Sequence, residues 1–399
     1  MTRLLLIFFL ALAASCTSNE TNKSDNAKEV KVFASPTDSI SAEPFLYTDP
    51  NGVVYLSWIQ KQKDSAYLKF STLTEGKWSE PRIISSGKNW FVNWADYPML
   101  VSDHKNNLLA HILEKSDSGV YTYDVKIITS ADRGNTWSKS KILNEDGKKA
   151  EHGFVSMHIY GDNYFLSWLD GRNAVMDSAS HEDHHGQMTL RAAVLNKQGV
   201  KSDEWELDER VCDCCQTSTA VTTNGPIVVY RDRSENEIRD ISIVRLINGK
   251  WTKPQSIVAD SWKIDGCPVN GPRADALENN LAIAWFSAPN KTGEVKVVFS
   301  KDGGSSFTDP IRLDEGEAIG RVDLVMLDGN SAMVSWMEGA TIKAARVYSD
   351  GTKEGSAAIS TSSSSRSSGF PQMTKSGNNI FFAWSDDKEK IIKVASLSL

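Results

Sequence analysis

The sequence is poor in cysteine and proline, with 5 and 12 residues in 399, and it has no long run of lysine or arginine. So few cysteines exclude a small disulfide-rich scaffold. The net charge of −7 and the lack of a basic patch leave no electrostatic footprint for a phosphate backbone, so we expect no nucleic-acid partner. Hydrophobic residues at 40% and charged residues at 24% are typical of a folded globular protein rather than a disordered chain.

Long apolar runs are also absent, and the one run of any length lies at the N-terminus, from Leu4 to Ala14. It is shorter than the roughly 20 residues that a transmembrane helix needs, so it predicts a signal peptide over residues 1–15. Leu12-Ala-Ala-Ser-Cys16 resembles the bacterial lipobox, in which the cysteine carries the lipid; ordinary cleavage beside an incidental cysteine is the alternative. Polar residues 16–28 predict a flexible tether. We therefore expect an extracytoplasmic protein that contacts a bacterial membrane, the outer membrane, only through lipid on Cys16.

Most of the chain consists of a repeat of a first strand, a turn of Asp, Asn or Gly, and an apolar second strand. The second strands end in an aromatic residue or histidine about 54 residues apart, which is the size of one four-stranded propeller blade, at Trp58, His111, Trp168, Tyr230, Trp285, Trp336 and Trp384. Alternating third strands follow. The seventh unit stops after its third strand, so we expect Glu29–Phe33 to supply the missing fourth strand and close the ring. The sequence thus predicts an all-β fold, a single closed β-propeller of seven four-stranded blades over residues 29–399.

Two turns between third and fourth strands share one motif. Ser130-Ala-Asp-Arg-Gly-Asn-Thr-Trp137 and Ser300-Lys-Asp-Gly-Gly-Ser-Ser-Phe307 resemble the Asp box of the sialidase (BNR repeat) superfamily. In such a turn the carboxylate can accept backbone N–H bonds, glycine supplies a positive φ, and the aromatic residue fills the blade. The resemblance covers roughly residues 40–399 and implies a propeller, which has six blades in sialidases, so six is the alternative to the seven units counted here.

The same resemblance implies an exo-sialidase-like glycoside hydrolase with an arginine triad, an aspartic acid and a tyrosine activated by glutamate. The family motifs are incomplete here, because Ser41–Phe45 lacks the first arginine and Phe370 stands near the position of the late tyrosine. Whether the protein is an enzyme therefore stays open.

Loops from second to third strands and connections between blades open on one end of a propeller. On that end units three to five carry the long loop 169–186, the loop 231–240, and the connections 211–216 and 265–273. We expect a ligand site there, because long loops on a rigid scaffold often carry function. Arginines would bind an anionic group and a carboxylic acid would act as acid or base, with loop salt bridges as the alternative: the candidates are Arg172, Arg231, Arg233 and Arg273 for binding, and Asp170 and Glu235 for catalysis. Trp94 could add a stacking surface for a sugar or pack between blades.

The same end also gathers sulfur and imidazole side chains. A disulfide framework and a metal site both fit them, the metal being copper or zinc because soft sulfur with imidazole suits these ions; the ligands would come from Cys212, Cys214, Cys215, Cys267, His181, His184, His185 and Met188.

Three functions follow from the sequence. The first is a sialidase-like propeller lipoprotein that acts on or recognises a glycan or another small anionic ligand. The second is a metal-binding propeller, and the third is a non-catalytic scaffold with structural disulfides. In each case we expect a monomer.

Overall fold

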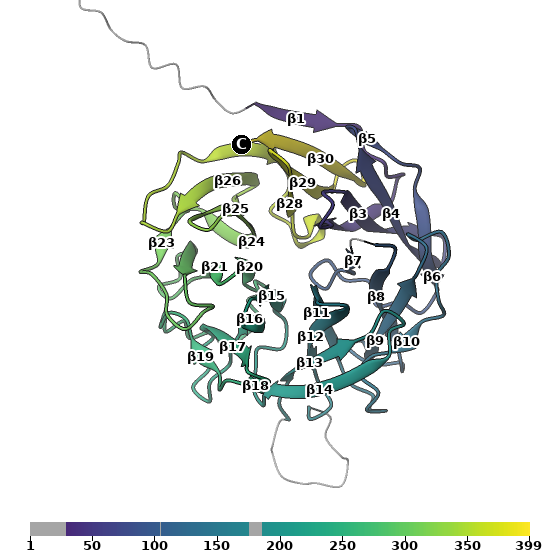
Figure 1. The fold of residues 1–399 in the computed structure, drawn as a ribbon, viewed down its shortest axis with the longest axis horizontal. Coiled ribbons are helices and arrows are strands. Elements are labelled where there is room, and N and C mark those ends of the chain that lie inside the picture. Colours follow the sequence, from purple (N-terminus) through teal and green to yellow (C-terminus); the bar gives the residue numbers. More distant parts are fainter. Residues whose placement is uncertain (1–28, 104, 175–185) are drawn as a thin grey trace, which may run out of the picture.

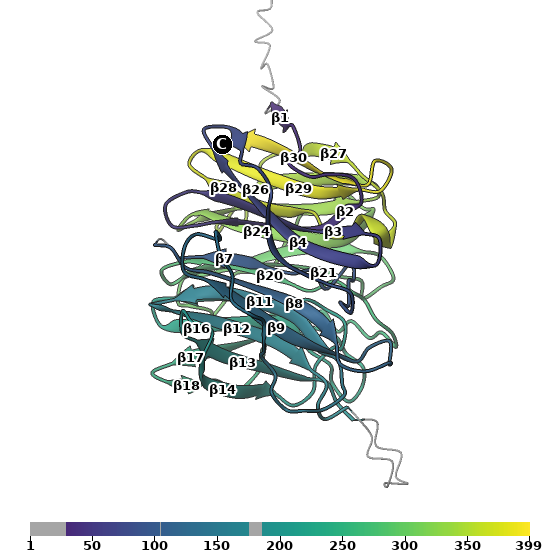
Figure 2. The ribbon, with the colours of Figure 1, turned by 90° about the vertical axis from the view of Figure 1, so that its right-hand side faces the viewer.

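Each of the seven sequence repeats folds into one antiparallel sheet, and the sheets form a closed ring around a common axis (Figure 1). The computed structural model describes residues 29–103, 105–174 and 186–399. Figure 2 views the ring from its side. The predicted seven-bladed propeller is confirmed, and the six-bladed alternative is wrong. Within the described ranges the one helical turn is η1 (Arg366–Ser368), and no helix is both long and apolar enough to cross a membrane.

Among the first four blades, blades 1, 2 and 4 have short outer strands, whereas all four strands of blade 3 are long. Written from the axis outward, their strands are β2 (Ser41–Thr48), β3 (Val54–Gln62), β4 (Ser65–Thr74), β5 (Lys77–Trp78) and β6 (Arg82–Gly87) in blade 1; β7 (Leu100–Ser102), β8 (Leu108–Lys115), β9 (Tyr123–Ser130) and β10 (Lys141–Ile142) in blade 2; β11 (His152–Tyr160), β12 (Asn163–Asp170), β13 (Thr189–Leu195) and β14 (Lys201–Asp208) in blade 3; β15 (Ser218–Thr222), β16 (Gly225–Arg231), β17 (Ile241–Ile247), β18 (Lys250–Trp251) and β19 (Gln255–Ser256) in blade 4. In blades 1 and 4 two short strands share the outer position.

The last three blades include the closure of the ring. Their strands are β20 (Arg273–Leu277), β21 (Asn280–Ser287), β22 (Glu294–Ser300) and β23 (Ile311–Arg312) in blade 5; β24 (Ala318–Asp328), β25 (Ser331–Glu338), β26 (Thr341–Tyr348) and β27 (Ala357–Thr361) in blade 6; β28 (Gln372–Ser376), β29 (Asn379–Asp386), β30 (Ile391–Ser398) and β1 (Val30–Phe33) in blade 7. Strand β1 pairs antiparallel with β30, with Phe33 opposite Val394. This confirms that the N-terminal strand completes the last blade, so that β30 is not left as an open edge.

The spaces between neighbouring sheets hold the core. The tryptophans that end four second strands, Trp58, Trp168, Trp285 and Trp336, are at most 1% exposed. Truncating a buried tryptophan to alanine costs about 3–5 kcal/mol. The repeated tryptophan is therefore a core residue that ties adjacent blades together.

Both Asp boxes are turns held by their carboxylates. Oδ1 of Asp132 accepts hydrogen bonds from the Ser130 hydroxyl at 2.8 Å and from the backbone N–H of Thr136 at 2.9 Å. Hydrogen bonds from Thr136 lower the pKa of Asp132 to about 2. Gly134 adopts a φ of 77°, as the motif predicts, and Trp137 packs edge-on against Phe70. We call the end of the ring with these turns the Asp-box face, and the end with the blade connections 209–217 and 257–272 the connection face.

The innermost strands are edge strands whose unpaired N–H groups need partners. Side chains from the preceding blade supply them: Asp96 accepts from Phe154 N at 2.8 Å, Ser156 from Thr219 N at 2.6 Å, Ser218 from Ala274 N at 2.9 Å, Asp275 from Met326 N at 2.7 Å and Asp323 from Met373 N at 2.6 Å. Polar residues on these strands therefore hold the ring together as well as lining its centre.

Candidate binding site in the central cavity

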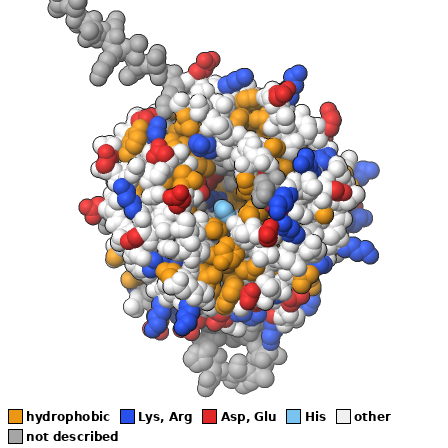
Figure 3. All heavy atoms as spheres, viewed as in Figure 1, with side chains coloured by type: hydrophobic (Ala, Val, Ile, Leu, Met, Phe, Trp, Pro, Cys, Tyr) orange, Lys and Arg blue, Asp and Glu red, His pale blue; other side chains and the backbone are white. Residues whose placement is uncertain are grey.

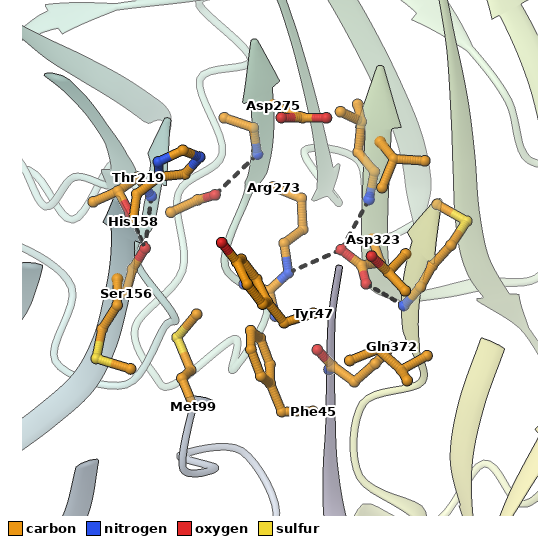
Figure 4. A pocket seen from close by; sticks show the side chains of 18 of the residues that line it. Phe45, Tyr47, Met99, Ser156, His158, Thr219, Arg273, Asp275, Asp323 and Gln372 are labelled. Atoms are coloured by element: carbon orange, nitrogen blue, oxygen red, sulfur yellow. Dashed lines mark hydrogen bonds and ion pairs between the residues drawn. The ribbon is translucent and has the colours of Figure 1, made fainter. Parts of the chain in front are cut away.

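A cavity of about 600 Å³ lies on the axis of the ring, and the innermost segments of all seven blades line it (Figure 4). A volume of this size suits a small organic ligand. Its wall combines apolar side chains such as Phe45 and Met99 with the polar and charged side chains of Tyr47, Arg273 and Asp323. The first strands of the repeat thus form both the inner edge of the ring and the wall of the cavity.

The cavity is open toward the Asp-box face. Pro50 and Leu277, at turns between first and second strands, belong to its wall and are exposed. Figure 3 shows the hollow at the centre of this face, with a histidine side chain in it. Among the described residues that line the cavity, His158 is the histidine.

Aromatic side chains close the axis on the connection face. Trp94 stacks on Phe370 with ring centroids 5.7 Å apart, and Tyr97 lies 6.1 Å from Phe370. Phe370 is 3% exposed. The long loops predicted a ligand mouth on the connection face, whereas the axial cavity opens on the opposite face, because the segments that lead into blades 2 and 7 carry these large rings. Trp94 therefore packs against another aromatic ring at the closed end of the cavity.

Arg273 begins β20 and points into the cavity (Figure 4). Its side chain is 14% exposed, and its Nε lies 3.5 Å from Oδ1 of Asp323 on the next blade. Its guanidinium carbon lies 5.7 Å from the centre of the Tyr97 ring. Within the described residues no hydrogen bond reaches its terminal nitrogens, so the forked donor group of this arginine stays available to a ligand.

Arg231 is buried more deeply than Arg273, and its guanidinium is fully hydrogen-bonded within the protein. Its guanidinium donates to the carbonyl oxygens of Asn270, Arg239 and Phe286, with the Nη2–Phe286 distance 2.7 Å, and it stacks over Trp262. With 2% of the residue exposed, Arg231 ties three segments together. This geometry favours a structural role over ligand binding.

Two other candidate arginines form ion pairs with carboxylates of the protein. Arg233 contacts Glu237 at 3.0 Å and Asp213 at 3.3 Å. Arg172 contacts Asp170 at 2.7 Å, and it also pairs with Asp146 and Glu204. The structure thus brings Arg172 and Asp170 together as an ion pair and leaves Arg273 as the candidate that lines the axial cavity.

Asp170 is the completely buried end of β12. Burial alone would raise the pKa of Asp170, but Arg172, His152 and Trp168 hold it below its usual value. Asp146, His152 and Asp170 offer atoms close enough for a metal ion, but the guanidinium of Arg172 already pairs with both carboxylates. Glu235 lies exposed in the 232–240 loop. Neither acid belongs to the wall of the axial cavity.

The four cysteines 212, 214, 215 and 267 come together on the connection face. The Sγ atom of Cys212 lies 3.7 Å from that of Cys215 and 4.0 Å from that of Cys214. The Cys267 thiol interacts with the Cys214 thiol. Met188 packs in the core cluster that Cys214 contacts. The other predicted ligands, His181, His184 and His185, and the lipidation residue Cys16 lie outside the described residues.

Four further residues line the cavity that the motifs did not indicate: Tyr47, His158, Asp275 and Asp323. The signal was present, since Asp275 and Asp323 occur inside the first strands of their repeats, where a side chain toward the axis is expected on alternate positions. What the repeat does not show is which of these polar side chains is already bonded to the next blade.

The cavity carboxyl groups hold less negative charge than their number suggests. Burial raises the pKa of Asp323 to about 6, although Arg273 opposes this rise, and burial raises the pKa of Asp96 to about 8. Burial also raises the pKa of Asp275, against the opposing effect of His158. At neutral pH Asp96 is therefore mostly protonated, so it adds little to the negative charge around Arg273.

Two polysaccharide lyases of known structure share the fold of this chain at low sequence identity. The polysaccharide lyase Uly1 aligns over 92% of this chain and 91% of its own, with a TM-score of 0.54 and 10% identity. An ulvan lyase bound to -[GlcA(1-4)Rha3S]- aligns over 80% of both chains, with a TM-score of 0.51 and 13% identity. The NanB sialidase of Streptococcus pneumoniae aligns over 94% of this chain and 71% of its own, with a TM-score of 0.43 and 14% identity. This chain spans 63% of the length of a Hadza microbial sialidase, with a TM-score of 0.44 and 13% identity.

Comparison of sequences adds the family. No curated protein sequence matches this chain. The sequence pattern of the BNR repeat-like domain matches residues 62–382, which is most of the propeller and includes both Asp boxes. The chain therefore belongs to the BNR repeat-like domain family, in agreement with the repeat that its Asp boxes indicated.

Proposed function

We propose that this protein binds a carbohydrate with a carboxylate or sulfate group in the central cavity, and that Arg273 binds the anionic group. One observation carries this proposal: the two terminal nitrogens of Arg273 form no hydrogen bond within the described residues. The Arg273 side chain is 14% exposed and forms one ion pair at 3.5 Å, so its other N–H groups can donate hydrogen bonds to a ligand. Planar guanidinium groups bind carboxylates and sulfates through two parallel hydrogen bonds.

The rest of the cavity suits a sugar ring. Apolar surface from Phe45, Met99 and Leu277 alternates with hydroxyl and amide groups such as those of Thr217 and Gln372. The volume of about 600 Å³ has room for one or two sugar units. The ulvan lyase with this fold was solved bound to -[GlcA(1-4)Rha3S]-, which makes anionic carbohydrates the first ligand class to test.

Recognition is the function that the cavity geometry supports. A sialidase-like reaction needs an activated tyrosine, but the Tyr47 hydroxyl donates to the carbonyl oxygen of Ser102 at 3.0 Å, and burial raises its pKa. Its proton is therefore held rather than released. Binding and hydrolysis can be measured separately on the same ligands.

The test is calorimetric titration of the purified full chain with uronic acid and sulfated oligosaccharides, beside the neutral sugar that matches each acid. We expect the acids to bind and Arg273→Ala to weaken binding about 10- to 100-fold, the loss of one charge-assisted hydrogen-bonded pair. Arg273→Lys should retain part of the affinity, because it keeps the charge and loses the fork.

The matched control is Arg233→Ala, which removes an arginine already paired with Glu237 and Asp213. It should leave the affinity unchanged. Equal affinity for an acid and its neutral counterpart, or full affinity in folded Arg273→Ala, contradicts the proposal.

We further propose that the protein acts as a monomer outside the cytoplasm, held to a bacterial membrane by lipid on Cys16. The polar segment 17–26 that follows Cys16 supports a tethered propeller.

A further inference from the structure

The cysteine cluster of Cys212, Cys214, Cys215 and Cys267 takes no part in the central cavity. It lies on the connection face, where the chain enters blades 4 and 5. Cys212 and Cys215 are at most 2% exposed, Cys214 is half-buried, and Cys267 is exposed. One thiol at the surface above three more deeply placed ones gives a compact sulfur site with a route in from solvent.

The sulfur spacing is that of ligands around one ion. The Sγ atoms of Cys212, Cys214 and Cys215 all lie within 4.8 Å of one another, and the two closest distances are 3.7 and 4.0 Å. Four thiolates bound tetrahedrally at about 2.3 Å from a zinc ion are separated by about 3.8 Å. A disulfide would require about 2.05 Å between sulfurs. The observed distances therefore match a shared metal ion.

The fourth thiol lies beside this set, outside the three sulfur atoms that all lie within 4.8 Å of one another. Cys267 comes from the connection that leads into blade 5, and it reaches Cys214 across the space between two blade connections. Ligands from two connections give an ion a role in fixing these segments to each other, which an isolated three-cysteine loop would lack.

A cation stands beside the sulfur atoms. Nη1 of Arg239, which is 3% exposed, donates to Sγ of Cys212 at 3.1 Å, and Nη2 of Arg239 pairs with Glu237 at 2.7 Å. A tetrathiolate site around a divalent ion carries an excess of two negative charges, so a neighbouring buried guanidinium stabilises it. The guanidinium of Arg239 therefore offsets part of the negative charge that four metal-bound thiolates would bring to this position.

We propose that Cys212, Cys214, Cys215 and Cys267 bind one zinc ion as a tetrathiolate site that fastens the connections into blades 4 and 5. Binding forms four zinc–sulfur bonds and releases the proton of each thiol that was protonated. No atom changes its oxidation state. The site needs no ligand from the 175–185 segment.

The test uses the reduced, metal-free full chain. Zinc is titrated against a chromophoric chelator, bound metal is counted by elemental analysis, and cobalt(II) replaces zinc so that its absorption reports the ligands. We expect one ion per chain, the charge-transfer and ligand-field bands of tetrahedral cobalt thiolate, and a higher thermal midpoint with zinc. Metal-loaded protein should protect four thiols from alkylation.

Variants separate this site from the rest of the chain. Cys267→Ser changes an exposed residue and should fold; we expect it to weaken zinc binding by about 10-fold or more and to lose part of the cobalt thiolate band. Arg239→Gln keeps all four sulfurs and should also weaken binding. Cys16→Ser, which removes the cysteine that lies outside the cluster, should bind zinc as the unchanged chain does.

Three results would overturn the proposal. The first is a purified chain whose mass shows two disulfides and which takes up no zinc after reduction. The second is uptake of copper(I) alone, without zinc or cobalt. The third is unchanged zinc binding in Cys267→Ser. Each is independent of carbohydrate binding, which the same samples report through Arg273.

Discussion

Nε of Arg273 and Oδ1 of Asp323 lie 3.5 Å apart, on the innermost strands of adjacent blades and across the wall of the central cavity. Oδ2 of the same carboxylate accepts the backbone N–H of Met373 on the following blade at 2.6 Å. Asp323 thus joins blades 6 and 7 while it holds one side of the arginine. We propose that the terminal nitrogens of Arg273 bind a ligand.

Asp323→Asn should tighten the binding of an anionic carbohydrate. The amide oxygen can still accept the N–H of Met373, but the negative charge that competes for Arg273 is gone. We expect a gain of about fivefold, the effect of one ion pair of about 1 kcal/mol. Calorimetry on this variant beside Arg273→Ala checks the prediction, since the two changes should move affinity in opposite directions. Weaker binding in both would mean that the carboxylate itself contacts the ligand.

Replacing Arg231 should cost stability rather than affinity. Arg231→Met leaves three buried carbonyl oxygens, those of Asn270, Arg239 and Phe286, without their donor. We expect a loss of about 3 kcal/mol or more in the free energy of unfolding. The control Arg233→Met removes a half-exposed ion pair and should cost about 0–1 kcal/mol. Denaturant unfolding followed by tryptophan fluorescence compares them, and equal losses would contradict the structural role of Arg231.

Stability should fall as the pH rises through neutrality, partly because of Glu43. This residue is 9% exposed, and its Oε2 has no hydrogen-bond partner. Burial raises its pKa from 4.5 to about 7, although Lys61 opposes the rise. The folded state therefore holds a proton that the unfolded state releases above pH 4.5, so this stability is present below pH 4.5 and is lost as the pH rises through 7.

Glu43→Gln removes that dependence. We expect the variant to be more stable than the unchanged chain at pH 8.5, by about 2 kcal/mol, and similar to it at pH 4.5. Thermal unfolding at several pH values measures the difference. Parallel curves for the two proteins would show that Glu43 ionises without cost.

The glycines of two surface turns give a matched pair for the Asp box. A Cβ at Gly134, where φ is 77°, would lie 2.5 Å from Cζ of Phe70, whereas a Cβ at Gly147, where φ is 67°, would meet nothing within 4 Å. Gly147→Ala should cost about 1 kcal/mol for its left-handed backbone. Gly134→Ala should cost clearly more, because it adds a clash with a core ring. Similar midpoints in denaturant for both variants would argue against tight packing under the box.

The proposed membrane anchor depends on lipid at Cys16. Cys16→Ser should move the protein from the membrane fraction to the soluble fraction of bacteria that express the full chain, because one lipidated residue supplies the attachment. Immunoblotting of the fractions measures this. An unchanged distribution contradicts lipidation, provided that the variant is still exported.

The repeat and its local chemistry determined the architecture. Spacing of about 54 residues between apolar second strands required blades of that size, and the short seventh unit left an edge that β1 fills by pairing with β30. The Asp boxes could be predicted for the same reason, because Ser130, Asp132 and Thr136 interact within one turn and the local sequence contains all the partners.

The proximity of the four cysteines was predictable from the order of the blades, but their sulfur distances were not, because those depend on how two connections pack. The site on the axis was also decided by tertiary structure. Asp323, Arg273 and Tyr97 come from three blades. Partners far along the chain decide whether an arginine can still bind a ligand. Arg231 donates to the carbonyl oxygen of Asn270, whereas Arg273 pairs with one carboxylate at 3.5 Å. A repeat specifies which strand faces the axis. Only the closed ring determines which polar groups of these strands already have hydrogen-bond partners. It also determines that Trp94 and Phe370 close one end of the cavity, because these contacts join residues distant in sequence.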